Sequence, residues 1–200
     1  VSSGVDIDAL SGVGHRVVHG GSIYSQPVVI NDEVLSVLKT LMPLAPLHNP
    51  VNYEGIVVAQ RYFKVPHVAV FDTAFHQTMP QRSYLYGVPY AWYQAHQVRR
   101  YGFHGISHHY VSQVAIDALK LSPDDHGLIT AHIGNGVSVT AIQNSQSVDT
   151  SMGFTPLEGV VMGTRSGNVD VGLLPYLMDV LGKDTHAVID DLNQKNFQHI

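Results

Sequence analysis

The sequence has no cysteine among its 200 residues and is poor in charge. The lack of cysteine excludes disulfides and thiolate-bound zinc, and it fits a reducing compartment such as the cytoplasm. Only 11 lysines and arginines stand against 16 aspartates and glutamates, so we expect no basic surface for nucleic acid. The longest apolar runs have the length of a strand, and no targeting segment is recognisable at the start, so we expect neither a membrane span nor export.

What the sequence does have is histidine, thirteen in all, in a chain that is 44% hydrophobic. That length and apolar content suffice for one large domain or two small ones, each with a core. Histidine serves as a metal ligand and as an acid–base group, but it is also common as a hydrogen-bonded residue of the interior. Composition leaves these alternatives open, and local context has to decide.

Hydrophobic periodicity predicts an α/β fold in which strands and helices alternate. A loop-rich stretch around Pro80 and Pro89 follows a change of composition between Asp72 and Pro80, where we expect a domain boundary. Helices are expected from Asn31 or Asp32 to about Leu41, from Val51 to about Tyr62, and over 107–121, 172–184 and 184–196; strands are expected over 16–19, 67–72 and, as a β-meander, 128–133, 137–142 and 147–149.

Two charged residues occur within or directly after apolar strands. Arg16 lies in GHRVVHGG, and Asp72 ends the run HVAVFD. A buried charge without a partner is costly, so each needs an ion pair or a ligand. Ligands of α/β folds bind at the carboxyl ends of strands, which favours a site at Asp72.

Two glycine-rich segments are candidates for binding anions. In HIGNG, the turn Gly134–Asn135–Gly136 after His132 can direct backbone N–H groups at a phosphate, but Asn-Gly is also the usual sequence of a plain hairpin turn. In MGTRSGN, Arg165 is flanked by small residues and can approach a phosphate or carboxylate closely. A solvated arginine on a surface loop is the alternative.

The segment YGFHGISHHY places His104 and His108 four residues apart, a spacing that would suit a metal site on a helix. Gly102 and Gly105 argue against a helix through His104, and the segment contains no acidic residue to complete a ligand set. We therefore interpret His104 as a loop residue of a site, and His108 and His109 as structural residues at the start of a helix. The whole set of candidates suits phosphoryl transfer, which needs positioning and neutralisation of charge.

Six segments in consecutive order resemble the acetate kinase/propionate kinase (acetokinase) family. They are GHRVVHGG, LAPLHNP, VAVFDTAFHQTMP, RRYGFHGISH, HIGNGVSV and DTSMGFTPLEGVVMGTRSG, and the likeness runs from about Gly14 to Gly172. The resemblance implies a ribonuclease-H-like α/β fold of the actin-like ATPase superfamily. It assigns 1–74 to part of the N-terminal domain and 75–200 to part of the C-terminal domain, both incomplete. It also implies a homodimer.

The activity that the resemblance implies is reversible in-line transfer of the ATP γ-phosphoryl group to a short-chain carboxylate, with Mg²⁺, ATP and ADP. Arg16 and Arg165 would clamp the carboxylate and the moving phosphoryl group, Asp72 would assist the carboxylate and, indirectly, Mg²⁺, and His104 would hydrogen-bond the phosphoryl group. By the same resemblance, His48 and His132 would line the cleft, Gly134, Asn135 and Gly136 would cradle nucleotide phosphate, and Val18, Leu47, Phe103 and Pro156 would form the acyl pocket.

Some features depart from the family pattern or point in two directions. Valine at position 18 fills the space of an extra methylene and favours acetate, whereas GGSIY and the segment from Ser147 to Gly172 are nearer to propionate kinases. Ile106 and Asn168 replace a threonine and an aspartate of the family.

Family members also have segments on both sides of this one, which supply a phosphate-binding turn, an adenosine site and a glutamate that helps to hold Mg²⁺. These segments are not found here, as in a truncated, split or frameshifted form of the enzyme. We therefore expect negligible activity from this chain alone; the alternative is a non-catalytic module that binds phosphate or nucleotide or serves assembly.

Overall fold

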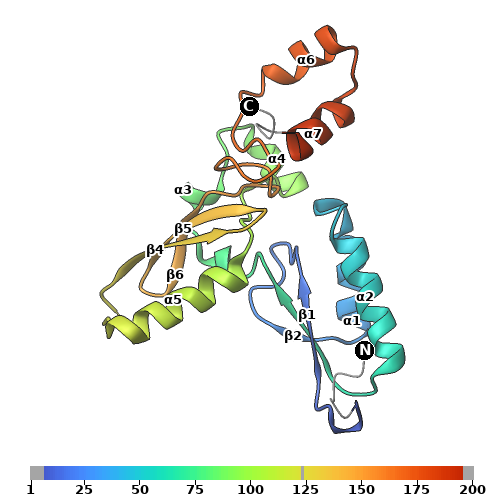
Figure 1. The fold of residues 1–200 in the computed structure, drawn as a ribbon, viewed down its shortest axis with the longest axis vertical. Coiled ribbons are helices and arrows are strands. Elements are labelled where there is room, and N and C mark those ends of the chain that lie inside the picture. The colour runs from blue at the N-terminus through green and yellow to red at the C-terminus, as the bar shows by residue number, and fades with distance from the viewer. Residues whose placement is uncertain (1–6, 123, 196–200) are drawn as a thin grey trace.

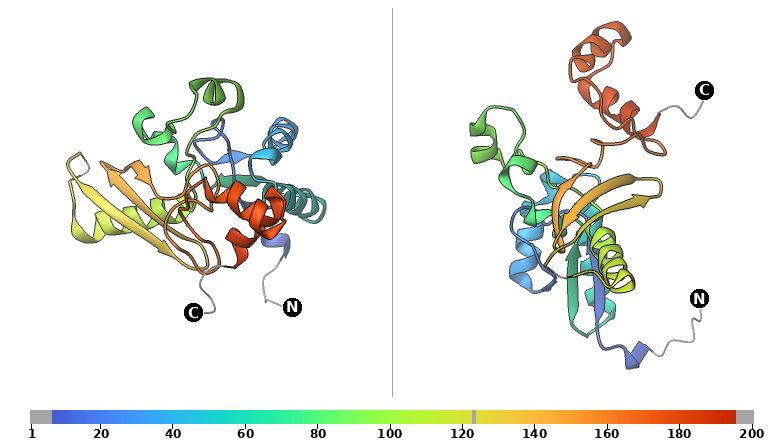
Figure 2. Two further views of the ribbon diagram at one scale, coloured as in Figure 1. Left: turned by 90° about the horizontal axis from the view of Figure 1, so that it is seen from above. Right: turned by 90° about the vertical axis from the view of Figure 1, so that its left-hand side faces the viewer.

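The computed structural model describes residues 7–122 and 124–195, and it contains two separate three-stranded sheets, each with its own helices (Figure 1). The two C-terminal helices, α6 (Leu173–Leu181) and α7 (Thr185–Gln194), stand together at one end (Figure 2). No helix among the described residues has both the length and the apolar character needed to cross a membrane.

The first sheet has the strand order β1-β3-β2 and follows the short 3₁₀ helix η1 (Ile7–Ala9). Strands β1 (Val13–Val17) and β3 (His67–Phe71) are parallel, and the two-residue strand β2 (Val28–Val29) runs antiparallel to β3. The connection from β2 to β3 contains α1 (Asp32–Thr40), η2 (Met42–Leu44) and α2 (Asn49–Tyr62). The sheet and these helices pack against each other in an aliphatic and aromatic core. It consists of Val17, Ile30, Val34, Leu38, Ile56, Ala69 and Phe71.

The segment between the two sheets was expected to be loop-rich, and here the structure corrects the prediction. It contains η3 (Phe75–Thr78) and two short helices, α3 (Gln81–Tyr84) and α4 (Tyr90–His96). Pro80 and Pro89, which suggested loop, are the N-cap residues of these helices. Proline at a helix start loses no hydrogen bond, because the first N–H groups of a helix have no partner within it.

The second sheet is an antiparallel meander in the order β4-β5-β6, as expected from the sequence. Its strands are β4 (Gly127–Ile133), β5 (Val137–Gln143) and β6 (Gln146–Thr150). Asn144 and Ser145 both have positive φ, the geometry of a two-residue hairpin turn. Helix α5 (Gly105–Leu119) packs along β4, and Ser138, Thr140 and Ile142 of β5 are buried.

The first strand ends earlier than predicted, at Val17 rather than at His19. The N–H groups of Val18 and His19 are bound by the side-chain oxygens of Asn52 and Asn49, at 3.1 Å each. These two residues therefore leave the sheet and run along the start of α2. The predicted α5 and α2 begin two residues earlier than expected, at Gly105 and Asn49. The domain boundary at 74/75 lies between the two sheets and stays a prediction.

Candidate active site

Arg16 and Asp72, which the sequence indicated separately, are joined in an ion pair. Asp72 directly follows β3, and its N–H donates to the carbonyl of Val17 at the end of β1. Arg16 Nε donates to Asp72 Oδ1 at 3.1 Å, and Nη2 donates to Oδ2 at 2.5 Å. Hydrogen bonding to this carboxylate raises the pKa of Arg16. Asp72 is buried while 61% of the Arg16 side chain is exposed, so Asp72 orients a guanidinium that an anion can reach.

His104 occupies the residue before α5 in a left-handed backbone conformation, with φ of 58° and ψ of 20°. The next N–H, of Gly105, donates to the carbonyl oxygen of Asp72 at 2.8 Å. A Cβ at position 105 would lie 2.2 Å from that oxygen, so only glycine fits. His104 thus lies outside the helix, as the flanking glycines predicted, although the helix begins at Gly105 rather than at residue 107. A non-glycine residue with positive φ is costly and occurs preferentially at functional sites.

The imidazole of His104 is held in its neutral form. Burial lowers the pKa of His104 to about 4, and the neighbouring His132 lowers it further in the same direction. The two rings stack with centroids 4.0 Å apart, and His132 Nδ1 is 2.9 Å from the hydroxyl of Ser107. At neutral pH, His104 therefore offers one N–H donor and no positive charge.

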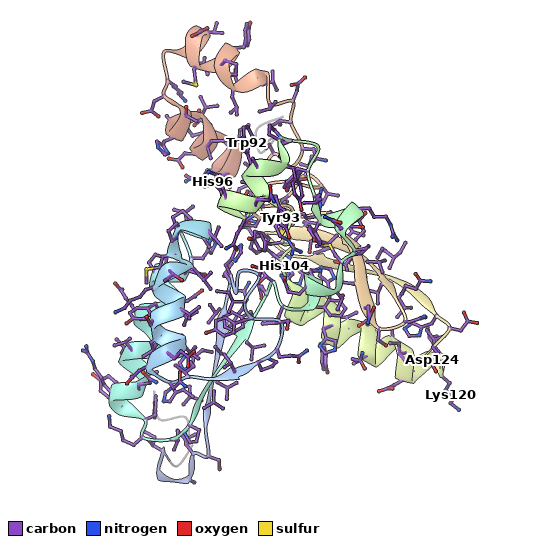
Figure 3. All side chains as sticks on the ribbon, turned by 180° about the vertical axis from the view of Figure 1, so that it is seen from behind. Trp92, Tyr93, His96, His104, Lys120 and Asp124 are labelled. Atoms are coloured by element: carbon purple, nitrogen blue, oxygen red, sulfur yellow. The ribbon has the colours of Figure 1, made fainter. Side chains whose placement is uncertain are left out.

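Arg165 and His104 border the same space beside the glycine turn that follows β4. A Cβ at Gly136 would lie 3.2 Å from Arg165 Nη1 and 3.3 Å from His104 Nε2, so glycine keeps this approach open. The N–H of Gly163 donates to the carbonyl of Asn135 at 3.1 Å, which ties the arginine loop to the turn. Figure 3 shows His104 where the two halves of the molecule meet.

His48, the N-cap residue of α2, lies near the same group of charges. Burial lowers the pKa of His48, and the charges of Arg165 and Arg16 lower it further. The charges of Asp72, Arg16 and Arg165 also act on His104. The structure thus gathers around one point the residues that the sequence singled out for catalysis and for lining the cleft: Arg16, His48, Asp72, His104, His132 and Arg165.

Of the four residues expected to form an acyl pocket, two lie in one buried apolar cluster and two lie outside it. Val18 and Phe103 are buried in one apolar cluster with Met152 and Met162, with Val137 packed against it. Leu47 is 74% exposed and lies outside this cluster. Pro156 is half-buried, and its carbonyl oxygen accepts from Arg165 Nη1 at 3.1 Å. Met152 and Met162 were not predicted as members of this cluster. Each precedes a glycine in a segment without regular secondary structure, so no hydrophobic periodicity indicated that it is buried.

Sequence reasoning missed the amides that shape the end of β1. Asn49 donates to the carbonyl of His19 at 3.0 Å and accepts from its N–H, so one side chain replaces a neighbouring strand. Thr73 Oγ1 accepts from the N–H of Gly20 at 2.9 Å. The spacing of Asn49 and Asn52, which share a face at the start of α2, was the available signal.

The two departures from the family pattern have different surroundings. Ile106 lines a hollow of about 520 Å³ with Val70, Phe71 and Phe75, so its apolar side chain has apolar neighbours. The side-chain oxygen of Asn168 accepts from the N–H of Gly159 at 2.8 Å. An aspartate would accept the same bond, so the substitution preserves this link within the arginine loop.

A metal centre does not form from the described residues alone, since these contain no group of three or more histidines and carboxylates suitably placed. Both carboxylate oxygens of Asp72 are bonded to Arg16. Mg²⁺ requires six oxygen ligands in octahedral geometry. These side chains therefore do not fit a magnesium ion by themselves.

Known proteins resemble this chain along nearly its whole length. The model of the acetokinase family matches residues 3–197. The acetate kinases of Caldanaerobacter subterraneus and Staphylococcus saprophyticus are 52% and 53% identical to it, over 96% and 94% of this chain and 48% and 47% of theirs. The chain thus spans about half the length of the curated relatives that it matches.

Solved structures share the fold. A propionate kinase from Francisella tularensis superimposes with a TM-score of 0.91 at 46% identity, covering 95% of this chain and 49% of that one. Acetate kinase from Porphyromonas gingivalis gives 0.90 at 47% identity, covering 96% and 48%. The α/β architecture expected from the sequence, that of the actin-like ATPases, is confirmed. With the family model matched from residue 3 to residue 197, this chain belongs to the acetokinase family.

Proposed function

We propose that the protein carrying this chain transfers the γ-phosphoryl group of ATP reversibly to a short-chain carboxylate. One observation carries the proposal: Arg165 and the neutral His104 border one space beside Gly136, within reach of the charges of Arg16 and Asp72. A phosphoryl group in transit carries negative charge on its equatorial oxygens, and donors fixed around it lower the barrier.

The proposed step forms a bond between a carboxylate oxygen and the γ-phosphorus and breaks the bond from that phosphorus to the bridging oxygen of ADP. No proton has to move, because the attacking carboxylate is already an anion. Arg16 holds the carboxylate, with Asp72 fixing the guanidinium in two hydrogen bonds. Arg165 and the N–H of His104 bind oxygens of the phosphoryl group, and His48 lines the cleft.

The nucleotide side of the site is proposed at the turn after β4. Gly134 and Asn135 are exposed and Gly136 is half-buried. The N–H of Gly134 donates to the carbonyl of Gly136 at 3.0 Å and closes the turn, so the N–H groups of Asn135 and Gly136 are the ones that can meet a phosphate, with His132 next to them. This use of the turn does not conflict with the hairpin geometry, which β4 and β5 also require. ATP and ADP are the co-substrates, and Mg²⁺ would arrive with the nucleotide and meet Asp72 only indirectly.

The preferred substrate is proposed to be acetate, with propionate as a weaker one. Val18 is buried against Phe103, and its two methyl groups occupy space that a longer acyl chain would need. One methylene changes discrimination by about 1–3 kcal/mol, so the two substrates overlap. The specificity constants for acetate and propionate measure this directly, and a preference for propionate would contradict the assignment of Val18.

A chimera tests the proposed activity. This chain replaces the matching half of the Caldanaerobacter subterraneus acetate kinase, and acyl phosphate is trapped with hydroxylamine. We expect activity that Arg165→Ala lowers by at least roughly 100-fold, as removal of one transition-state donor does. Arg82→Ala, at an exposed position of α3, is the matched control and should leave the rate unchanged. A folded but inactive chimera would instead favour the non-catalytic module.

A second measurement concerns the chain by itself. The described residues contain no group of three or more side chains that could hold a metal ion, and the relatives are about twice as long, so we expect negligible acyl phosphate formation from the purified 200-residue chain. Formation that Arg165→Ala abolishes would contradict this expectation. Calorimetric titration with ATP distinguishes a chain that still binds nucleotide from one that does not.

A further inference from the structure

A chain of buried hydrogen bonds runs from His104 into the interior beneath β5. His104 Nδ1 is 2.9 Å from Ser138 Oγ, and the same oxygen is 2.7 Å from His108 Nε2. His108 Nδ1 is in turn 2.8 Å from Thr130 Oγ1 on β4. Ser138, His108 and Thr130 are buried, at 0%, 1% and 5% exposure. We call these three residues the relay.

Counting protons limits the relay to two arrangements. The hydroxyl of Ser138 carries one proton, and these two imidazole nitrogens are its only hydrogen-bond partners among the described residues, so one nitrogen accepts that proton and the other donates. Burial lowers the pKa of His108 to about 3, with His76 lowering it further, so this ring is neutral and carries one N–H. In one arrangement, Ser138 donates to His104 Nδ1 and accepts from His108 Nε2; in the other, both directions are reversed.

Thr130 distinguishes the two arrangements. In the first, His108 Nδ1 is bare and accepts the proton of the Thr130 hydroxyl, so every group is satisfied. In the second, His108 Nδ1 donates to Thr130, whose own hydroxyl proton then has no acceptor among the described residues. A buried donor without a partner costs about 1–3 kcal/mol. The first arrangement is therefore the stable one.

We propose that Thr130, His108 and Ser138 are positioning residues that hold His104 with its proton on Nε2, the nitrogen facing the space beside Gly136. The inference rests on the proposed function, since it assigns the relay a use in phosphoryl transfer. With Nδ1 occupied by the Ser138 proton, a neutral His104 can present only a donor to that space. The reversed relay would present a lone pair, which would repel a phosphoryl oxygen.

Nuclear magnetic resonance of the 200-residue chain with ¹⁵N-labelled histidine tests the tautomer without any activity. Long-range ¹H–¹⁵N correlations identify which ring nitrogen carries the proton. We expect Nε2–H at His104 in the native chain and a mixture of tautomers in Ser138→Ala. A native chain with Nδ1–H, or with mixed tautomers, would overturn the proposal.

Two matched substitutions separate the relay from general packing. Thr130→Val removes the hydroxyl that sets the direction, and we expect the fraction of Nε2–H at His104 to fall. Thr140→Val removes another buried hydroxyl of the same sheet, one that contacts Thr150 at 2.8 Å and lies outside the relay, so the tautomer should stay unchanged. Equal effects of the two substitutions would contradict the relay. Backbone amide spectra confirm that each variant is folded.

Activity in the chimera supplies the second readout. Ser138→Ala should lower kcat by roughly 10-fold to 100-fold, the usual size of the effect when the hydrogen-bond partner that orients a functional histidine is removed. The KM values for ATP and for the carboxylate should change little. An inactive native chimera would refute the proposed function while the tautomer result still decides the relay. A variant with altered tautomer but unchanged kcat would refute the use of the relay in catalysis.

Discussion

At the scale of single residues, two buried or half-buried asparagine side chains form the hydrogen bonds that a neighbouring strand would otherwise form with the backbone after β1. Asn49 binds both the N–H and the C=O of His19, and Asn52 binds the N–H of Val18. These bonds direct the chain away from the sheet directly after Val17, so Arg16 is the second-to-last residue of β1 and lies beside Asp72. The position of the guanidinium thus depends on amides that themselves touch no substrate.

Asn49→Ala should destabilise the fold. The change leaves the N–H and C=O of His19 buried without partners, and each such group costs about 1–3 kcal/mol. Urea denaturation should show a lower free energy of unfolding, while Gln94→Ala, at an exposed position of α4, should change it by less than about 0.5 kcal/mol. Equal stability of the two variants would show that another group binds His19.

Buried histidines make stability depend on pH. Burial lowers the pKa of His19 and of His76 to about 4, below the ordinary value near 6.5. Between these values the unfolded chain binds more protons than the folded one, so stability is complete above about pH 6.5 and falls as the pH is lowered toward 4. Each group contributes a slope of up to roughly 1.4 kcal/mol per pH unit in this window.

The measurement is urea denaturation at about pH 7 and about pH 5. His76 donates through Nε2 to the carbonyl of Phe103 and accepts through Nδ1 from Ser147, bonds that a glutamine amide can partly reproduce. His76→Gln should therefore lower stability at neutral pH but give a smaller loss on acidification. A loss as large as that of the native chain would mean that His76 does not titrate in this window.

At the scale of helices and strands, glycine has opposite roles in α2 and α5. Gly55 lies exposed within α2, and a Cβ there would meet no atom within 4 Å. Gly105 begins α5 against the carbonyl of Asp72, where a Cβ has no room. The first glycine is replaceable and the second is required by the contact between β3 and α5.

Gly55→Ala should raise the free energy of unfolding by roughly 0.5–1 kcal/mol, because alanine loses less backbone entropy in a helix. Gly105→Ala should lower it and should displace His104, since the first turn of α5 must move away from Asp72. Thermal denaturation compares the two variants in one experiment. A stable Gly105→Ala variant with an unchanged His104 resonance would contradict the contact.

The sequence predicted the helices and strands better than the residues at which they begin and end. Those boundaries determine where the side chains of the candidate site lie. Periodicity indicated α1, α2, α5 and the meander, because each buries one face. It could not show that β1 stops at Val17, because that depends on amides more than thirty residues away. It identified Arg16 and Asp72 as charges in need of a partner but not that they pair with each other. The direction of the relay was invisible, because Ser138 and Thr130 look like ordinary strand residues until His108 is placed between them.

At the scale of the whole molecule, several apolar surfaces are exposed. Ile129 and Ile133 of β4 are 78% and 79% exposed, and Tyr176 and Val180 of α6 are also exposed. We predict a homodimer, as the family resemblance implies. Light scattering coupled to size-exclusion chromatography measures the mass, and Ile129→Lys tests whether β4 contributes. A monomer at micromolar concentration would contradict the prediction for this chain.

The two sheets differ in what fills the space behind them, and cooling should therefore affect them differently. The first rests on valine, isoleucine, leucine and phenylalanine side chains, whereas β5 and its neighbours bury Thr130, Ser138, Thr140, Ser147 and Thr150. Exposure of apolar surface raises the heat capacity of unfolding and exposure of polar surface lowers it. Since hydrophobic stabilisation weakens in the cold, the half that carries Arg16 and Asp72 should loosen before the half that carries His104. The hydroxyl-lined interior would then keep the side of the site proposed to bind the phosphoryl group in shape at temperatures where the side proposed to bind the carboxylate has begun to open.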